Sequence, residues 1–225
     1  MKNTLSILLV ILILISCKND KSTSEEIEVL AVKEDTTAEA IANKNGYNNW
    51  AKVSELKFTF NVDRGERHFE RSWIWKPKTH DITMITSSDT ISYNQAKLDS
   101  ITTKADASFI NDRYWLLAPF HLVWDTGTTF SESKKVVAPL SKDTLNLLTI
   151  VYGNEGGYTP GDAYDLFYED DFTLREWIFR EGNDSIPSMT TTWEGYKDFN
   201  GITLSTMRKD STDNFKLYFT NISVK

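Results

Sequence analysis

Two carboxylates lie next to a cluster of glycines in the stretch NEGGYTPGDAYD, residues 154–165, a combination that can hold a hard cation. Asp162 and Asp165 supply the carboxylates, and the glycines allow backbone carbonyls to turn toward a shared centre. Their spacing matches no calcium-binding loop, so these two residues are weak metal candidates. The preferred interpretation is a hairpin loop in which Asp162 caps a turn by accepting backbone N–H bonds.

Other catalytic chemistry has little support in the residue pattern. The three histidines, His68, His80 and His121, are scattered and form no zinc-ligand motif. There is no G-x-S-x-G elbow and no glycine loop for phosphate. Acidic runs such as 169–171 are typical of solvated turns, although a carboxylate pair for hydrolysis needs only to be close in space. The sequence therefore identifies no catalytic residue and no cofactor, and an envelope hydrolase stays as an alternative.

Cys17 is the single cysteine of the chain, and it follows an apolar run from Leu5 to Ile15. That run has the length of a secretory h-region and is too short to cross a bilayer as a helix. The sequence Leu14-Ile15-Ser16-Cys17 resembles the lipobox of bacterial lipoproteins. The resemblance implies that residues 1–16 are a signal peptide and that Cys17 becomes a first residue carrying palmitate-type acyl chains.

Residues 17–34 are mostly polar and charged and lack helical or alternating periodicity until their end, which predicts a flexible tether. Several acyl chains on Cys17 would hold the protein stably at a membrane. The expected location is the bacterial cell envelope, at the outer membrane. Whether the domain faces the periplasm or the cell surface is left open.

The remainder of the chain, residues 35–225, has the length of a single domain with a sizeable core. The full sequence carries 32 acidic and 25 basic residues, a net charge of −7, which argues against a nucleic-acid partner. Aromatic residues make up 12% of the chain, more than a minimal core needs. Some of them are therefore candidates to contact a ligand.

The first half of this domain combines short helices with hairpins. Thr36 and Glu39 have capping-box spacing before a helix that Asn45-Gly46 would end. Alternating apolar residues in 56–62 and in 67–77 flank a turn at 63–66, which predicts a hairpin. Residues 80–94 read as two more strands. A second helix is expected to begin near Ala105 and to stop at Pro119.

The second half repeats the hairpin pattern, with turn residues at 170–171 and at Asn200-Gly201. The prediction is a mainly β (α+β) fold: about ten strands in a single large, strongly curved antiparallel sheet, a half-barrel, with two or three short helices on its concave side.

Several stretches together carry a resemblance to a known family: NGYNNWAKVSELKFTF, NDRYWLLAPFHL, AYDLFYEDDFTLREWIF and WEGYKDFNGITL. Their order resembles the lipoprotein-carrier (LolA and LolB) superfamily and, more closely, uncharacterised lipoproteins of Bacteroidota. The resemblance covers about residues 36–225. It implies a half-open barrel whose concave face, covered by helices, accepts acyl chains. It also implies an arginine that holds the helices closed, for which Arg113 is the candidate by position.

An acyl chain requires an apolar surface and few directional contacts. Trp73 and Trp75 alternate with Ile74, so both indoles should lie on one sheet face. The expected ligand-binding residues are Trp73, Trp75, Tyr114, Trp115, Phe120 and Trp124. The same residues could form the packed core instead.

The sequence therefore favours a lipid-anchored, non-catalytic envelope protein that binds a lipid or another apolar ligand in a concave sheet. Two alternatives remain: the carboxylate hydrolase, and a protein-interaction subunit whose sheet core is filled. An open apolar cavity, convergent carboxylates or a filled sheet would distinguish the three.

Overall fold

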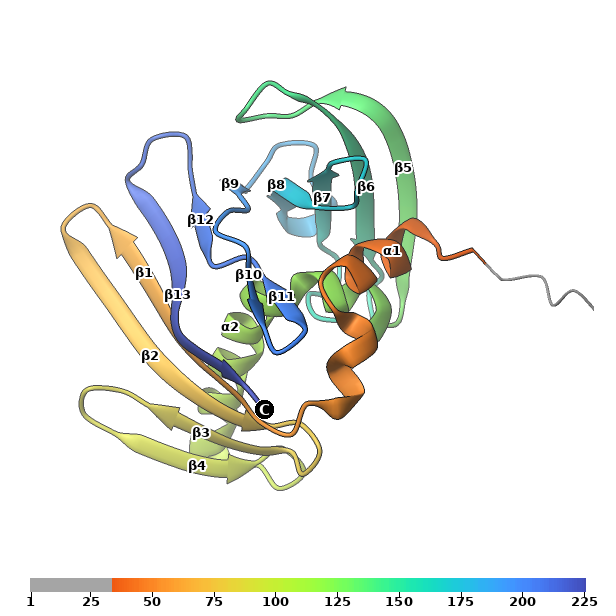
Figure 1. The fold of residues 1–225 in the computed structure, drawn as a ribbon. Coiled ribbons are helices and arrows are strands. Elements are labelled where there is room, and N and C mark those ends of the chain that lie inside the picture. The colour runs from red at the N-terminus through yellow and green to blue at the C-terminus, as the bar shows by residue number, and fades with distance from the viewer. Residues whose placement is uncertain (1–33) are drawn as a thin grey trace, which may run out of the picture. The chain divides into compact units, whose positions relative to one another are not determined.

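The computed structural model describes residues 34–225 (Figure 1). The helical elements are α1 (Thr37–Lys44), η1 (Tyr47–Lys52), α2 (Ser100–Trp124) and η2 (Glu181–Asn183). The strands are β1 (Leu56–Arg64), β2 (Arg67–Lys76), β3 (Asp81–Ile85), β4 (Thr90–Asn94), β5 (Thr128–Val137), β6 (Thr144–Tyr152), β7 (Ala163–Tyr168), β8 (Leu174–Arg180), β9 (Met189–Thr192), β10 (Lys197–Phe199), β11 (Ile202–Leu204), β12 (Met207–Lys209) and β13 (Phe215–Val224).

Within the described residues the strands pair only in antiparallel fashion, in two large sheets and one small one. The first sheet has the order β12-β13-β1-β2-β3-β4, the second β5-β6-β7-β8-β9, and β10 pairs with β11. Hairpins connect most neighbours, as at Gly65, whose φ of +58° suits the tight turn between β1 and β2. Antiparallel order follows from these short connections, since parallel strands need long crossovers.

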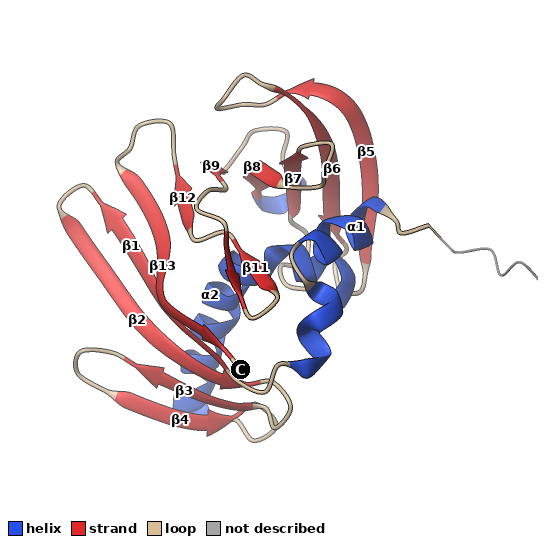
Figure 2. Cartoon of the chain, viewed as in Figure 1, coloured by secondary structure: helices blue, strands red, loops and turns tan. Residues whose placement is uncertain are grey.

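The two large sheets meet where β9 runs into β12. Glu194 and Met207 form an isolated antiparallel bridge there, with N–H···O distances of 2.9 and 3.1 Å. The Lys209 N–H also donates to the Thr192 hydroxyl at 3.1 Å. The two sheets therefore continue one another around a curve that stays unclosed (Figure 2).

The mainly β, antiparallel fold class predicted from the sequence is confirmed, with 13 strands rather than about ten. The expected single sheet is interrupted at the β9–β12 junction, where short strands leave only one bridge. The additional strands are short, three residues each in β10, β11 and β12. Pieces of this length carry little alternation, so the sequence pattern does not separate them from loops.

The first helix begins as the sequence predicts. The Thr36 hydroxyl accepts the Glu39 N–H at 3.2 Å, and the Glu39 carboxylate accepts the Thr36 N–H at 2.7 Å, so the capping box is complete. Asn45 occupies the C-terminal cap. Ala38, Ile41 and Ala42 form the buried face.

The second helix is longer than predicted at both ends and is not a short helix. It begins at Ser100 because Asp99 caps it, accepting the N–H groups of Ile101 and Thr102 at 3.0 and 2.8 Å. It also continues through Pro119, with a kink at Leu117, where φ is −116° and ψ is 21°. Pro119 interrupts the helix without ending it, because Arg208 of the distant strand β12 donates to the Trp115 carbonyl that proline cannot satisfy.

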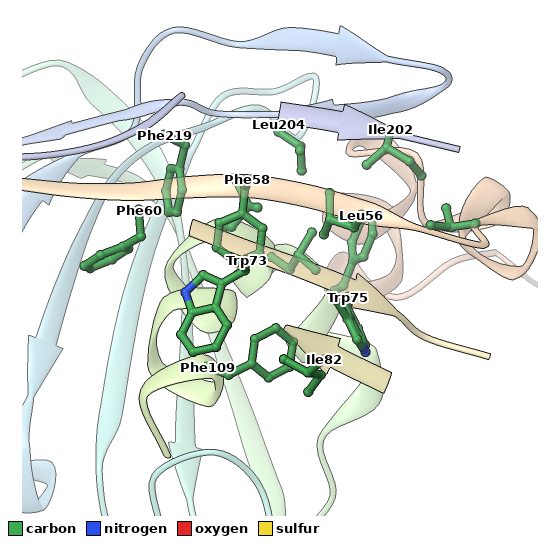
Figure 3. Packing of buried hydrophobic residues seen from close by; sticks show 14 of the residues in the cluster. Leu56, Phe58, Phe60, Trp73, Trp75, Ile82, Phe109, Ile202, Leu204 and Phe219 are labelled. Carbon is green, nitrogen blue, oxygen red and sulfur yellow. The ribbon is translucent and has the colours of Figure 1, made fainter. Parts of the chain in front are cut away.

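The interior consists of two hydrophobic clusters that share α2. The first joins α2 to β1, β2, β3 and β13, with Phe58, Trp73 and Phe109 almost fully buried (Figure 3). The second joins α2 to β6, β7 and β8. Because α2 contributes to both clusters, it lies between the two large sheets. Between residues 34 and 225, no helix combines the length and the apolar character required to span a bilayer.

Candidate functional site

A groove of about 560 Å³ lies between the N-terminal half of α2 and the inner face of β2, β3 and β4. We call it the α2 groove. Most of its surface is apolar. It is lined by Phe69, Arg71, Met84, Thr86, Ile91, Ser100, Ile101, Lys104, Ala105 and Ser108.

The sequence builds this groove from two simple periodicities. Phe69 and Arg71 are two residues apart on β2 and so face the same side, and Met84 of β3 pairs directly with Ile91 of β4. On α2 the lining residues 101, 104, 105 and 108 have the spacing of one helical face. The sheet therefore supplies the floor and the helix supplies one wall.

The inner end of the groove is closed by an ion pair between sheet and helix. Arg71 of β2 donates from Nε and Nη2 to the two carboxylate oxygens of Asp112, the second contact measuring 2.7 Å. Trp73 Nε1 donates to the same carboxylate at 2.8 Å. The Asp112 side chain is completely buried. Burial raises the pKa of Asp112, although the hydrogen bonds and the charge of Arg71 act in the opposite direction.

The outer end of the groove is open and carries exposed apolar side chains as well as Lys104. Ile101 is 64% exposed and Phe69 is 48% exposed, although both line the groove. Leu98, two residues before Ser100, is 41% exposed. Exposed apolar residues that gather at the mouth of an apolar groove indicate a binding surface more strongly than scattered ones do.

The aromatic residues expected to bind a ligand lie in the packed interior. Trp73, Trp75, Tyr114 and Phe120 are at most 6% exposed, and Trp115 and Trp124 are partly buried. None of them lines the α2 groove. They contact one another and the rest of the core, as when Trp50 meets Trp75, Phe120 and Trp124 at ring-centroid distances of 5.1–5.5 Å.

The prediction that Trp73 and Trp75 share a sheet face is confirmed. Both indoles meet the Phe109 ring edge-on, at 5.3 and 5.4 Å (Figure 3). Both are therefore turned toward α2. Trp73 also reaches the closed end of the α2 groove through its bond to Asp112.

Arg71 contacts the helix from β2 through an ion pair, and Arg113 has another environment. Arg113 lies on α2 with its guanidinium over the Trp75 and Phe109 rings, at 5.4 and 5.5 Å. Its Nε is buried, and no residue in the described range 34–225 accepts a hydrogen bond from it. Burial lowers the pKa of Arg113. Arg113 therefore packs against the aromatic rings of Trp75 and Phe109, whereas Arg71 forms an ion pair between β2 and α2.

Sequence reasoning missed Arg71 and Asp112, which are 41 positions apart. One available signal was Arg71 itself, a charged residue in phase with Phe69 and Trp73 on the apolar face of a strand. A second was Asp112, which lies three positions after Phe109 and therefore on the same face of the predicted helix. Buried charges are almost always paired, so each of them implied a partner.

The weak metal candidates have other partners in the structure. Asp165 accepts a hydrogen bond from the Thr149 hydroxyl at 2.6 Å and pairs with Arg180 at 2.9 Å. Asp162 accepts the Gly182 N–H at 2.8 Å. Within residues 34–225, no group of three or more His, Cys, Asp or Glu side chains is arranged to hold a metal ion.

The buried carboxylates are used for structural bonds. Besides Asp112, they are Asp106 and Glu176. Asp106 accepts hydrogen bonds from Tyr93 and Gln95 at 3.1 and 2.8 Å. Glu176 accepts two backbone N–H groups at the β5–β6 turn, both at 2.7 Å. These contacts leave no convergent carboxylate pair among the buried acids of the described range. Cys17 lies outside the described residues.

No family model and no curated protein matches this sequence. Among solved structures, a DUF1329 family protein from Desulfovibrio piger has 9% identity and a TM-score of 0.46, covering 84% of this chain and 92% of its own. A LolA superfamily protein from Nitrosomonas europaea has 9% identity and a TM-score of 0.43, covering 85% and 94%.

A domain ascribed to an outer membrane lipoprotein-sorting protein, from Vibrio parahaemolyticus, also has 9% identity, with a TM-score of 0.45 over 82% of this chain and 91% of that one.

Proposed function

We propose that this protein binds an acyl chain, without catalysis, in the α2 groove, at the surface of the bacterial envelope membrane to which Cys17 would attach it. The observation that carries the proposal is the groove itself, an apolar recess with exposed apolar residues at its mouth. Its volume of about 560 Å³ lies within the range typical of small-molecule sites.

The energetics of an acyl chain fit such a recess. Each buried CH₂ group contributes about 0.8 kcal/mol. A micromolar dissociation constant corresponds to about 8.2 kcal/mol, so about ten buried methylenes would be needed before the cost of association is counted. A long chain can supply that number. A short apolar metabolite cannot.

The two alternatives fit the structure less well. A carboxylate hydrolase needs acids that are free to act on substrate, and the buried acids are bonded to structural partners. The interaction-subunit alternative is favoured by the packed aromatics between the sheets. It does not account for the open groove beneath α2.

A pair of variants on α2 tests the groove. Ser108→Phe places a ring into the groove, whereas Ala107→Phe places the same ring on the exposed side of the helix. In a chain that begins at Lys18, the first variant should weaken binding of a fluorescent acyl probe by at least tenfold. The second should bind like the wild type.

Thermal midpoints of both variants would show that the domain still folds. A wild-type chain that binds no acyl probe would refute acyl binding. Equal binding by the two phenylalanine variants would place the ligand elsewhere.

The membrane attachment is tested separately, at Cys17. The wild-type chain expressed in bacteria should incorporate labelled palmitate and sediment with membranes, and Cys17→Ala should do neither. Label retained by Cys17→Ala would refute the anchor and leave the acyl-binding groove as a separate question.

A further inference from the structure

We propose that the ligand of the α2 groove is a fatty acid, with its chain on the groove floor and its carboxylate held by Lys104 at the mouth. This inference rests on the proposed acyl-binding function and adds the chemistry of the headgroup. The expected ligand has one acyl chain and a single anionic end.

The charge of the groove differs from that of the protein. The whole chain carries 32 acidic and 25 basic residues. The groove lining contains two cationic side chains, Arg71 and Lys104, and no carboxylate. In a protein with an acidic excess, a recess whose charged lining residues are all cations favours an anionic ligand group.

Lys104 is the cation of the lining that is available to a ligand. Arg71 is neutralised by the carboxylate of Asp112 at the closed end. Lys104 has no ion-pair partner among residues 34–225 and lies on the exposed edge of α2. A lysine can lay its methylenes along an apolar wall and keep its ammonium group in water at the rim.

The two acids nearest to Lys104 in sequence do not oppose this assignment. The carboxylate of Asp106 is buried and accepts hydrogen bonds from Tyr93 and Gln95. Asp99 precedes the groove-lining Ser100, and its carboxylate accepts the N–H groups of Ile101 and Thr102. These bonds, with that of the Thr102 hydroxyl, lower the pKa of Asp99. Its charge is therefore turned toward the helix N-terminus, where the helix dipole stabilises it.

The remaining polar groups of the lining can assist a carboxylate. The hydroxyls of Ser100 and Ser108 flank Lys104 on α2 and have no hydrogen-bond partner within the described range. Each can donate to an anionic oxygen. The apolar residues Phe69, Met84 and Ile91 lie below them on the sheet and would contact the chain. The groove is thus amphipathic in the order that a fatty acid requires.

The test compares ligands that differ only in their headgroup. A chain that begins at Lys18 is loaded with N-phenyl-1-naphthylamine, a neutral apolar probe, which is then displaced by laurate, dodecanol or dodecylamine. Laurate should displace the probe at a concentration roughly fivefold lower than dodecanol, since an exposed ion pair is worth about that factor. Dodecylamine should be the weakest, and added salt should reduce the difference.

Two charge reversals locate the contact. Lys104→Glu should remove the preference for laurate, whereas Lys97→Glu, a reversal of an exposed lysine outside the groove lining, should retain it. Dodecanol displacement should be nearly unchanged in both, which shows that the groove is intact.

Each outcome has one meaning. Equal displacement by the three ligands, or a preference that survives Lys104→Glu, overturns the fatty-acid inference and leaves acyl binding in place. A wild-type chain that takes up neither probe nor ligand overturns the proposed function and this inference together.

Discussion

Both halves of α2 face an apolar surface of a sheet. They differ in how completely side chains fill the space between helix and sheet. The C-terminal half meets β6, β7 and β8 across large rings that fill the space, including Tyr114, Tyr164 and Trp177. The N-terminal half packs Phe109 against Trp73 and Trp75, but next to this contact it presents Ala105 and Ser108 to the sheet and leaves the α2 groove. Residue size on one helical face thus decides whether a sheet is sealed or left open to a ligand.

A buried arginine, Arg208, contacts α2 at the kink between the two halves. Pro119 has no N–H to donate to the Trp115 carbonyl, and Arg208 of β12 donates to that oxygen instead, from Nη2 at 2.9 Å. Its Nη1 donates to Ser205 and to the Met207 carbonyl, and its guanidinium stacks on Trp193 at 3.5 Å. Complete burial without a carboxylate partner lowers the pKa of Arg208 to about 9.

The largest effect is expected at this junction. Arg208→Ala should lower the free energy of unfolding by about 3–5 kcal/mol, because it opens a cavity and leaves buried carbonyl groups without donors. Arg208→Met keeps most of the volume and should recover part of the loss. Arg175→Ala, at an exposed arginine paired with Glu169, is the matched control and should change little. Urea unfolding measures all three. A loss below about 1 kcal/mol for Arg208→Ala would mean that the kink does not need this residue.

A smaller loss is expected where the N-terminal half meets the sheet. Asp112→Ala leaves the Arg71 guanidinium and the Trp73 indole without their acceptor, and should cost about 2–3 kcal/mol in urea unfolding. Arg71 is partly exposed, so water can compensate part of the cost. Asp143→Ala, at an exposed acid, should be neutral. If Asp112→Ala were equally neutral, the groove would not depend on this ion pair.

The pH dependence of stability should report on the C-terminal half of α2. His121 is buried in the C-terminal half, with Nδ1 2.9 Å from Asp125 Oδ1, and burial lowers the pKa of His121 below 6.5 even though Asp125 opposes the shift. The unfolded chain therefore takes up a proton near pH 6.5 that the folded chain does not, and stability falls as pH drops through this value.

His121→Gln should weaken that dependence. The urea midpoint of the wild type should fall more between pH 7.5 and 5.5 than that of the variant. Parallel changes in the two proteins would assign the pH dependence to other groups.

The smallest effect on stability is expected at the groove mouth. Ile101→Ser should change the free energy of unfolding by no more than about 0.5 kcal/mol, because the side chain is 64% exposed. It should nevertheless weaken acyl binding, by a few-fold. Ile186→Ser, at an isoleucine that is 72% exposed and remote from the groove lining, should affect neither. Unchanged binding in Ile101→Ser would place the chain deeper in the groove or elsewhere.

Local patterns in the sequence determined the features that depend on neighbouring residues. The capping box of Thr36 and Glu39, the hairpin turn at Gly65 and the shared face of Trp73 and Trp75 are set by spacing and backbone preference. They were predicted for that reason. The mainly antiparallel β class followed from the same alternation and turn signals.

Only the tertiary structure decided where the space between α2 and the sheets is left as a groove and where side chains fill it. The helix passes Pro119 because Arg208, 93 positions after Trp115, supplies the missing donor, and the groove is closed at one end because Arg71 finds Asp112 at a distance of 41 positions. Aromatic content predicted a binding surface, but the rings pack in the core and the groove is lined mainly by smaller or more flexible side chains. Periodicity tells which face of an element is apolar. Which other face covers it, and how completely, depends on contacts between residues that are far apart in the chain.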